Sequence, residues 1–198
     1  MMSQGITLRA LTGSKTWRID MEINQSQLLQ AVPFLYKPRL DEFVASFNMW
    51  AIHFGINTPM RMAHYLAQVF HESGSLRYAE EIASGAKYEG RKDLGNIMPG
   101  DGVKYKGRGF IQLTGRANYT AFKKSEFCTA DVVANPKKVA EFPLNQVASM
   151  WFWQTHKCNE WADRDNVDRV TRIINGGTNG LTQRKALLAK FKKVLGVK

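Results

Sequence analysis

Glu72 stands at the end of a segment patterned as an amphipathic helix, and Gly74 follows almost at once. Spacings of three and four residues return to the same side of a helix, so Tyr65 and Gln68 share a stripe with Glu72. The partial negative charge of a helix C-terminus and an apolar wall both raise the pKa of a carboxyl group. A glutamate in this position can serve as a general acid near neutral pH, although a solvated helix end shows the same pattern.

Several more carboxylates follow in the next stretch of chain: Glu80, Glu81, Glu89, Asp93 and Asp101. Hydrolysis of a glycosidic bond with inversion uses two carboxyl groups about 6.5–9.5 Å apart, so that a water fits between the base and the sugar. Glu81 lies across the turn at Gly74 from Glu72, which makes this separation easy to reach. For each of these acids, taken singly, a solvated loop residue stays open as the alternative.

Two further blocks carry groups that could hold a sugar. In YKGRGFIQLTGRANY, residues 105–119, two glycines flank Arg108 and allow the backbone to approach a ligand closely. Amide, hydroxyl and aromatic groups follow within a turn or two: Gln112, Thr114, Asn118 and Tyr119. In IINGGTNG, residues 173–180, Asn175 can present an amide to a ligand or orient a catalytic group, or the block is a plain loop between helices.

The sequence contains no motif that predicts a metal or cofactor site. His71-Glu72 could begin the HExxH motif of zinc proteases, but position 75 is serine. The glycines match neither dinucleotide nor P-loop spacing, so we expect no cofactor and no metal. Cys128 and Cys158 are too few for a disulfide scaffold, and we expect free thiols, although a pair outside the cell is conceivable.

The remaining pattern predicts the elements that must position these groups. Helices are expected in seven segments: 26–35, 40–54, 58–73, 116–124, 144–157, 166–174 and 182–195. Thr58 and Thr114 are expected to cap two of them, and Trp151, Phe152 and Trp153 are expected to anchor the core. Residues 73–109 hold eight of the chain's 16 glycines and break the helical pattern. We therefore expect a mainly α, lysozyme-like, two-lobed domain in which this glycine-rich segment lines the cleft.

Length and composition favour one soluble domain over residues 21–198, and we expect residues 1–20 to form a flexible N-terminal extension. We expect a monomer. The 198 residues carry a net charge of +11, which favours polyanions, yet no helix-turn-helix, RNP or zinc pattern supports a nucleic-acid partner. Neither a signal peptide nor a membrane-spanning run is recognised, so we expect the protein to stay in the cytoplasm until it is released.

Four blocks together resemble glycoside hydrolase family 19, which includes plant-type chitinases and many phage endolysins. They are AHYLAQVFHESG, YEGRKDLGN, PGDGVKYKGRGFIQLTGRANY and INGGTNGL, between about Met62 and Arg184. The chain looks most like the compact phage or prophage lysozymes of that family. Membership implies a helical lysozyme-like fold and metal-free, inverting hydrolysis of β-1,4 bonds beside N-acetylated sugars, here in host cell lysis.

The resemblance also implies roles for particular residues. Glu72 matches the acid, and Glu81 is the best match for the base, with Glu80 and Glu89 as weaker alternatives. Thr114 matches the hydroxyl that holds the attacking water. The implied substrate-binding group is Gln112, Asn118, Tyr119, Asn175 and Arg184, the last matching an arginine that contacts the catalytic carboxylates.

The short connections favour peptidoglycan over crystalline chitin, and a chitinase or a non-catalytic sugar-binding module stays open as an alternative. The resemblance implies a holin-like partner that releases the protein from the host cytoplasm to the periplasm and cell wall. The last segment, RKALLAKFKKVLGVK, is basic and amphipathic. It is either a packed final helix with a solvated basic face or an element that contacts the anionic outer membrane.

Overall fold

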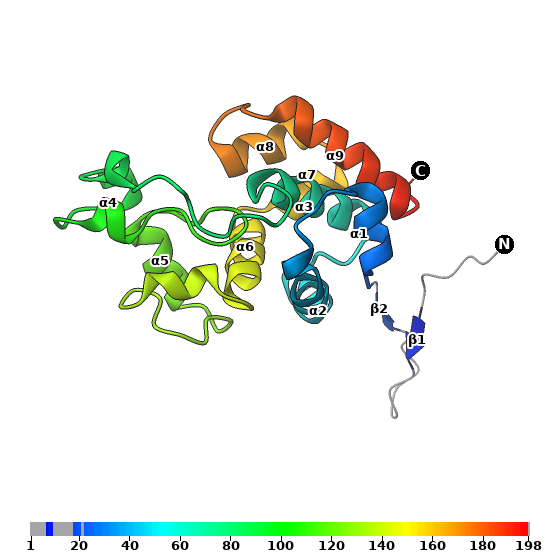
Figure 1. Cartoon of the computed structure of the whole chain (residues 1–198), viewed down its shortest axis with the longest axis horizontal. Coiled ribbons are helices and arrows are strands. Elements are labelled where there is room, and N and C mark those ends of the chain that lie inside the picture. Colours follow the sequence, from blue (N-terminus) through cyan, green and yellow to red (C-terminus); the bar gives the residue numbers. More distant parts are fainter. Residues whose placement is uncertain (1–6, 10–17, 21, 198) are drawn as a thin grey trace.

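The computed structural model describes residues 7–9, 18–20 and 22–197 and is mainly helical (Figure 1). Strands β1 (Thr7–Arg9) and β2 (Arg18–Asp20) pair antiparallel, with Thr7 opposite Asp20. The expectation of a flexible extension over residues 1–20 falls largely outside the described residues. The α-helices, in chain order, are α1 (Gln25–Ala31), α2 (Leu40–Trp50), α3 (Pro59–Glu72), α4 (Asp101–Lys104), α5 (Arg116–Lys123), α6 (Leu144–Thr155), α7 (Cys158–Asp163), α8 (Val167–Asn175) and α9 (Leu181–Val194). Short 3-10 turns cover Lys37–Arg39, Ala51–Phe54, Ala86–Tyr88, Lys92–Leu94 and Pro136–Ala140.

Helix α3 lies at the centre of the larger lobe, and nine consecutive residues, Met62–Phe70, are buried. Helix α9 lies along α3, with the rings of Phe70 and Phe191 5.1 Å apart, edge to face. The ring of Tyr65 meets Trp153 of α6 at 5.4 Å. A helix buried on all sides cannot shift without opening the core, so the end of α3 is a fixed point in the molecule.

The smaller lobe contains α4 and α5 and lies at the far end of the long glycine-rich segment (Figure 1). Asp101, which is buried, accepts the backbone N–H groups of Ile97 and Met98 and pairs with Arg116 of α5. One carboxylate therefore holds a loop and a helix together. The mainly helical, two-lobed architecture expected from the sequence is confirmed.

Several local predictions can be compared with the structure. Thr58 caps α3 as expected, because its hydroxyl oxygen accepts the N–H of Arg61 at 3.2 Å. The predicted cap at Thr114 is wrong: the residue before α5 is Gly115, and the Thr114 hydroxyl donates to the carbonyl of Gln112 at 2.8 Å. Asn24 caps α1 through a capping box with Gln27, two residues earlier than predicted.

Two further differences concern α6 and α7. Trp153 is fully buried as predicted, whereas Trp151 and Phe152 are only partly buried against the core. Helix α7 was not predicted from the sequence, since Lys157 turns the chain in the left-handed region, with φ of 56°, directly before it. Cys128 and Cys158 are free thiols, as expected.

Candidate active site

A pocket of about 280 Å³ lies where the end of α3 meets the glycine-rich segment. Its lining residues come from the helix end, from the chain that follows it and from the loop before α5: Glu72, Tyr78, Glu80, Glu81, Ile82, Ala83 and Gln112. The structure thus brings three acids and one amide from separate parts of the sequence to one place. Two of these residues, Glu72 and Glu81, are the pair expected to act as acid and base.

Glu72 is held by groups that reach it from the core. Its carboxylate pairs with the guanidinium of Arg184, which is only 1% exposed. The same guanidinium donates to the side-chain oxygen of Gln68, whose amide nitrogen donates to the hydroxyl of Thr171 at 3.3 Å. The neighbour of Glu72 is therefore a buried cation and not the apolar wall expected from the sequence.

The stripe expected along α3 also has a different role. Tyr65 and Gln68 are fully buried, because α6, α8 and α9 cover that side of the helix. Gln68 does not face the cleft but orients Arg184, which in turn contacts Glu72. The spacing of three and four residues does place Gln68 and Glu72 on one side of α3, but there they share a buried chain of hydrogen bonds through Arg184.

The turn after Glu72 is tight and strained. Ser75 and Leu76 both take positive φ values, 59° and 72°. Ser73 stabilises the turn, because its hydroxyl donates to the Val69 carbonyl at 2.7 Å and accepts the N–H of Leu76 at 2.8 Å. Left-handed conformations at residues other than glycine cost free energy and cluster at functional sites. Here they return the chain across the end of α3.

Short antiparallel pairings then fix the second wall of the pocket. The N–H of Glu81 donates to the carbonyl of Gly107 at 2.9 Å, and the N–H of Gly109 donates to the carbonyl of Ala79 at 2.9 Å. Arg108 pairs in turn with Leu113. The segments that carry Glu81 and Gln112 are thereby joined through residues 107–109.

Glu81 is held by groups near the surface. Its carboxylate accepts the N–H of Gly107 and the hydroxyl of Tyr88, each at 3.3 Å, and pairs with Lys87 at 2.9 Å. The bond to Glu81 raises the pKa of Lys87. Lys87 is 63% exposed, so this cation is screened by water and free to move.

The two alternative acids have other partners. Glu80 pairs with the buried Arg108 at 3.0 Å and with Lys106 at 3.3 Å. Glu89 accepts the N–H groups of Gly100 and Gly102 at 2.7 and 2.8 Å, at the start of α4, and does not line the pocket. Glu80 thus lines the pocket but is paired with a buried cation, and Glu89 holds the start of α4, so the assignment of the base to Glu81 stays a prediction.

Gly107 brings Glu81, Gln112 and Thr114 close together. A Cβ at this position would lie 2.6 Å from Oε1 of Gln112 and 3.3 Å from Oγ1 of Thr114. Its N–H is the one that Glu81 accepts. No side chain larger than hydrogen fits here without moving Gln112, which itself takes a φ of 59°.

The remaining expected substrate-binding residues lie in different environments. Asn118 is partly buried and donates to the carbonyl of Thr114 at 2.8 Å. Tyr119 is fully buried and donates to the carbonyl of Lys106 at 2.9 Å, so its ring offers no surface to a sugar. Burial raises the pKa of Tyr119 to about 12, which keeps this hydroxyl a donor. Tyr119 was expected to contact the substrate, but it instead supports Arg108, whose guanidinium donates to its hydroxyl oxygen.

The loop that follows Asn175 packs against His71, the neighbour of Glu72, through Gly180. Asn175 is exposed and ends α8, and it does not line the pocket. Further along, a Cβ at Gly180 would lie only 2.2 Å from Nε2 of His71. Burial and the nearby Arg184 lower the pKa of His71. The glycine therefore allows the loop to close over the residue next to Glu72.

Sequence reasoning missed Tyr78, Ile82 and Ala83 as lining residues. Tyr78 is partly exposed, and its ring lies against Gly74, where a Cβ would be 3.1 Å away. Ile82 is largely exposed at the rim. An aromatic and an aliphatic residue beside the carboxylates were the available signal, because sugar rings stack on such surfaces.

Comparison with known proteins agrees with this geometry. The family model described as "Chitinase class I" matches residues 58–171, which include Glu72, Glu81, Gln112 and Thr114. The chain belongs to glycoside hydrolase family 19. It is therefore a chitinase-like glycoside hydrolase, as the sequence predicted. Asn175 and Arg184 lie beyond the matched range.

Individual relatives come from bacteria and plants. A family 19 domain-containing protein of Haemophilus influenzae is 35% identical over 162 residues, which cover 66% of this chain and 78% of that protein. An endochitinase of Arabidopsis thaliana is 37% identical over 168 residues, 78% of this chain and 55% of the plant protein. The chain thus spans only about half of that plant relative.

Solved structures show the same fold. Chitinase C from Streptomyces griseus superposes with a TM-score of 0.71 at 21% identity, over 88% of this chain and 93% of that one. The class IV chitinase of Zea mays gives a TM-score of 0.57 at 22% identity, over 89% and 83%.

Proposed function

We propose that this glycoside hydrolase cuts β-1,4 bonds of bacterial peptidoglycan with inversion, with Glu72 as the acid and Glu81 as the base. The observation that carries the proposal is the single pocket that both carboxylates line, one from a helix end and one from the loop wall. An inverting reaction needs two such groups on opposite sides of the bond, with room for a water.

Each acid has neighbours that suit its role. Glu72 ends the first step as a carboxylate, and Arg184 beside it stabilises the negative charge that develops when the proton leaves. Glu81 must begin ionised to accept a proton from water, and Lys87 and the N–H of Gly107 stabilise that form. Thr114 donates to Gln112, so its free lone pairs are available to hold the attacking water.

Charge and architecture support a wall substrate. The net charge of +11 favours a polymer that carries carboxylates and an envelope rich in phosphate. In a phage or prophage setting, the monomeric enzyme would reach the wall after release from the cytoplasm by a holin-like partner. Among the described residues, no helix is long and apolar enough to span a membrane.

A chitinase is the second candidate, because several relatives are named endochitinases. The two can be separated by offering purified Gram-negative peptidoglycan and a soluble chitin oligosaccharide to the same preparation. We expect faster release of reducing ends from peptidoglycan, and mass spectrometry of reduced products then shows which sugar carries the new end. Faster cleavage of chitin would replace the proposal, and loss of both activities in Glu72→Gln would exclude a contaminating enzyme.

A further inference from the structure

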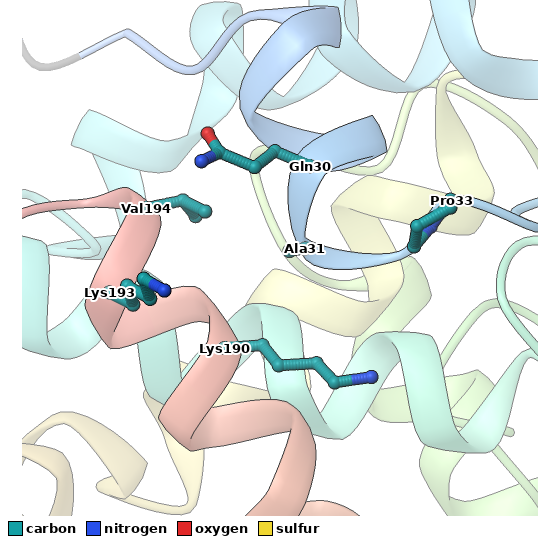
Figure 2. Close-up of a pocket in the computed structure, with 6 residues that line it drawn as sticks. All are labelled: Gln30, Ala31, Pro33, Lys190, Lys193 and Val194. Atoms are coloured by element: carbon teal, nitrogen blue, oxygen red, sulfur yellow. The ribbon is translucent and has the colours of Figure 1, made fainter.

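A second hollow, of about 330 Å³, lies between α1 and α9, away from the residues that line the catalytic pocket (Figure 2). We call it the α1–α9 hollow. Gln30 extends from α1 towards α9, and Lys190 and Lys193 extend from successive turns of α9 (Figure 2). The lining residues are Gln30, Ala31, Pro33, Lys190, Lys193 and Val194. Nothing in the catalytic arrangement uses any of them.

Among the described residues, no carboxylate compensates the charge of this hollow by a salt bridge. Neither α1 nor α9 contains an acidic residue. Two other lysines of α9 have carboxylate partners, Lys185 with Asp168 at 2.7 Å and Lys192 with Asp165. Lys190 and Lys193 are exposed, and no salt bridge joins either of them to a residue of the described ranges. Within the part of the chain that the structure describes, Lys190 and Lys193 are therefore the lysines of α9 that form no salt bridge, and both line the hollow.

An apolar side chain projects next to the hollow. Phe34, which directly follows the lining residue Pro33, is 94% exposed. Its neighbour Leu35 is buried, and the N–H of Tyr36 donates to the carbonyl of Ser75 at 2.9 Å. The turn is thus fixed on the core by the residues after Phe34, and its packing directs the ring outward. A fully exposed large aromatic side chain beside cations is typical of surfaces that meet a membrane interface.

Helix α9 itself cannot insert into a membrane as an amphipathic helix. Its apolar residues Leu188 and Phe191 are buried in the core, where the Phe191 ring meets Phe70. Exposing them would open the larger lobe. The final helix is therefore packed with a solvated basic face, and a lipid contact has to use that face together with Phe34.

We propose that the α1–α9 hollow and Phe34 dock this protein on an anionic phospholipid surface. Lys190 and Lys193 meet the phosphate groups, while the apolar lining and the Phe34 ring meet the region just below them. Docking is peripheral and leaves the fold unchanged. The inference does not rest on the assignment of Glu72 and Glu81. It gives Lys190 and Lys193 a role beyond keeping the protein soluble.

Sedimentation of the full chain with vesicles tests the proposal. We expect binding to vesicles of phosphatidylglycerol and phosphatidylcholine, weak binding to pure phosphatidylcholine, and a decrease with added salt. Lys190→Gln with Lys193→Gln should weaken binding to the anionic vesicles roughly thirtyfold, since each lysine near such a surface contributes about fivefold. Phe34→Ser should weaken it by about tenfold.

A matched double variant separates a site from general charge. Lys124→Gln with Lys137→Gln removes two exposed lysines outside the hollow and should leave binding nearly unchanged. Glu72→Gln should bind vesicles like the parent, so a wrong catalytic assignment would not affect the result. Equal weakening in both double variants, equal binding to pure phosphatidylcholine, or no binding at all would each overturn the proposal. Thermal unfolding verifies that every variant is folded.

Discussion

Glu72 and Glu81 line one pocket and are almost equally exposed, 17% and 16%, yet they are held in different ways. Glu72 ends a buried helix and pairs with a buried arginine, which is tied through Gln68 to α8. Glu81 lies on a loop and pairs with a lysine that is mostly in water. Exposure of the acid therefore says little about how firmly it is placed.

The difference separates stability from catalysis. On the helical side, the groups that position Glu72 also belong to the core, so a change there should reduce both folding stability and activity. On the loop side, the groups that position Glu81 are short backbone pairings and surface cations, so a change there should reduce activity with little loss of stability.

Glu72→Gln should have the largest effect, a loss of roughly 10²–10⁴-fold in hydrolysis, because the amide cannot donate the proton to the leaving sugar. The rate at which the turbidity of outer-membrane-stripped Gram-negative cells decreases measures this loss of hydrolysis. The melting temperature shows whether the protein still folds. Full activity in this variant would remove Glu72 from the mechanism.

Glu81→Gln should lose activity in the same range of roughly 10²–10⁴-fold, with almost no change in stability. Glu80→Gln and Glu89→Gln are matched controls, since both carboxylates have structural partners instead. We expect these controls to retain far more activity and to unfold more easily. If Glu80→Gln proves the more inactive variant, the base is Glu80.

Arg184→Met should destabilise the protein by about 3 kcal/mol, since it leaves Glu72 and the oxygen of Gln68 without their donor. Urea unfolding followed by tryptophan fluorescence measures the free energy, and activity should decrease in parallel. A stable but inactive variant would contradict the view that the helical side couples the two properties.

Gly107→Ala is the counterpart on the loop side. The new methyl group would displace Gln112 and disturb the N–H that Glu81 accepts. We expect roughly tenfold lower activity, since general base catalysis depends on the position of the carboxylate, with a melting temperature near that of the parent. A loss of stability as large as that of Arg184→Met would contradict the view that the loop side affects activity without affecting stability.

Acidification should give the smallest effect, and it should act on the helical side. Burial lowers the pKa of His64 and His71, both on α3. A base whose pKa is lower when folded binds its proton first in the unfolded chain, so stability decreases as the pH falls below about 6.5. Each histidine contributes a slope of at most about 1.4 kcal/mol per pH unit. Urea unfolding of His64→Gln between pH 7 and pH 5 should show a shallower slope than the parent.

Part of this structure could be predicted because the signal is local. Thr58 and Pro59 start α3 where expected, since a cap and a first-turn proline act on the adjacent backbone. The cap predicted at Thr114 failed because Gly115, with a φ of 91°, is the residue that directly precedes α5, so Thr114 lies one position too early to cap it. Helix α7 was missed because its left-handed start at Lys157 has no side-chain signature.

The burial of particular polar groups depended on distant parts of the chain. Gln68 and Tyr119 carry groups that suit a sugar site, and both are buried because other segments pack over them. Tyr78 and Ile82 line the pocket although nothing in their immediate sequence requires it. These outcomes depend on which surfaces pack together in the folded protein. The spacing of residues along one segment does not encode that packing.

The sequence by itself therefore determined the helical family 19 fold and supplied Glu72 at the end of a capped helix, since these depend on periodicity, caps and ordered motifs. Only the tertiary structure decided that Gln68 ties Arg184 to the core beside Glu72, which other residues line the pocket with it, and which lysines of the final helix pair with carboxylates. Ion pairs between segments far apart in the chain form only when folding brings the charges within a few ångströms, and no local pattern encodes that distance.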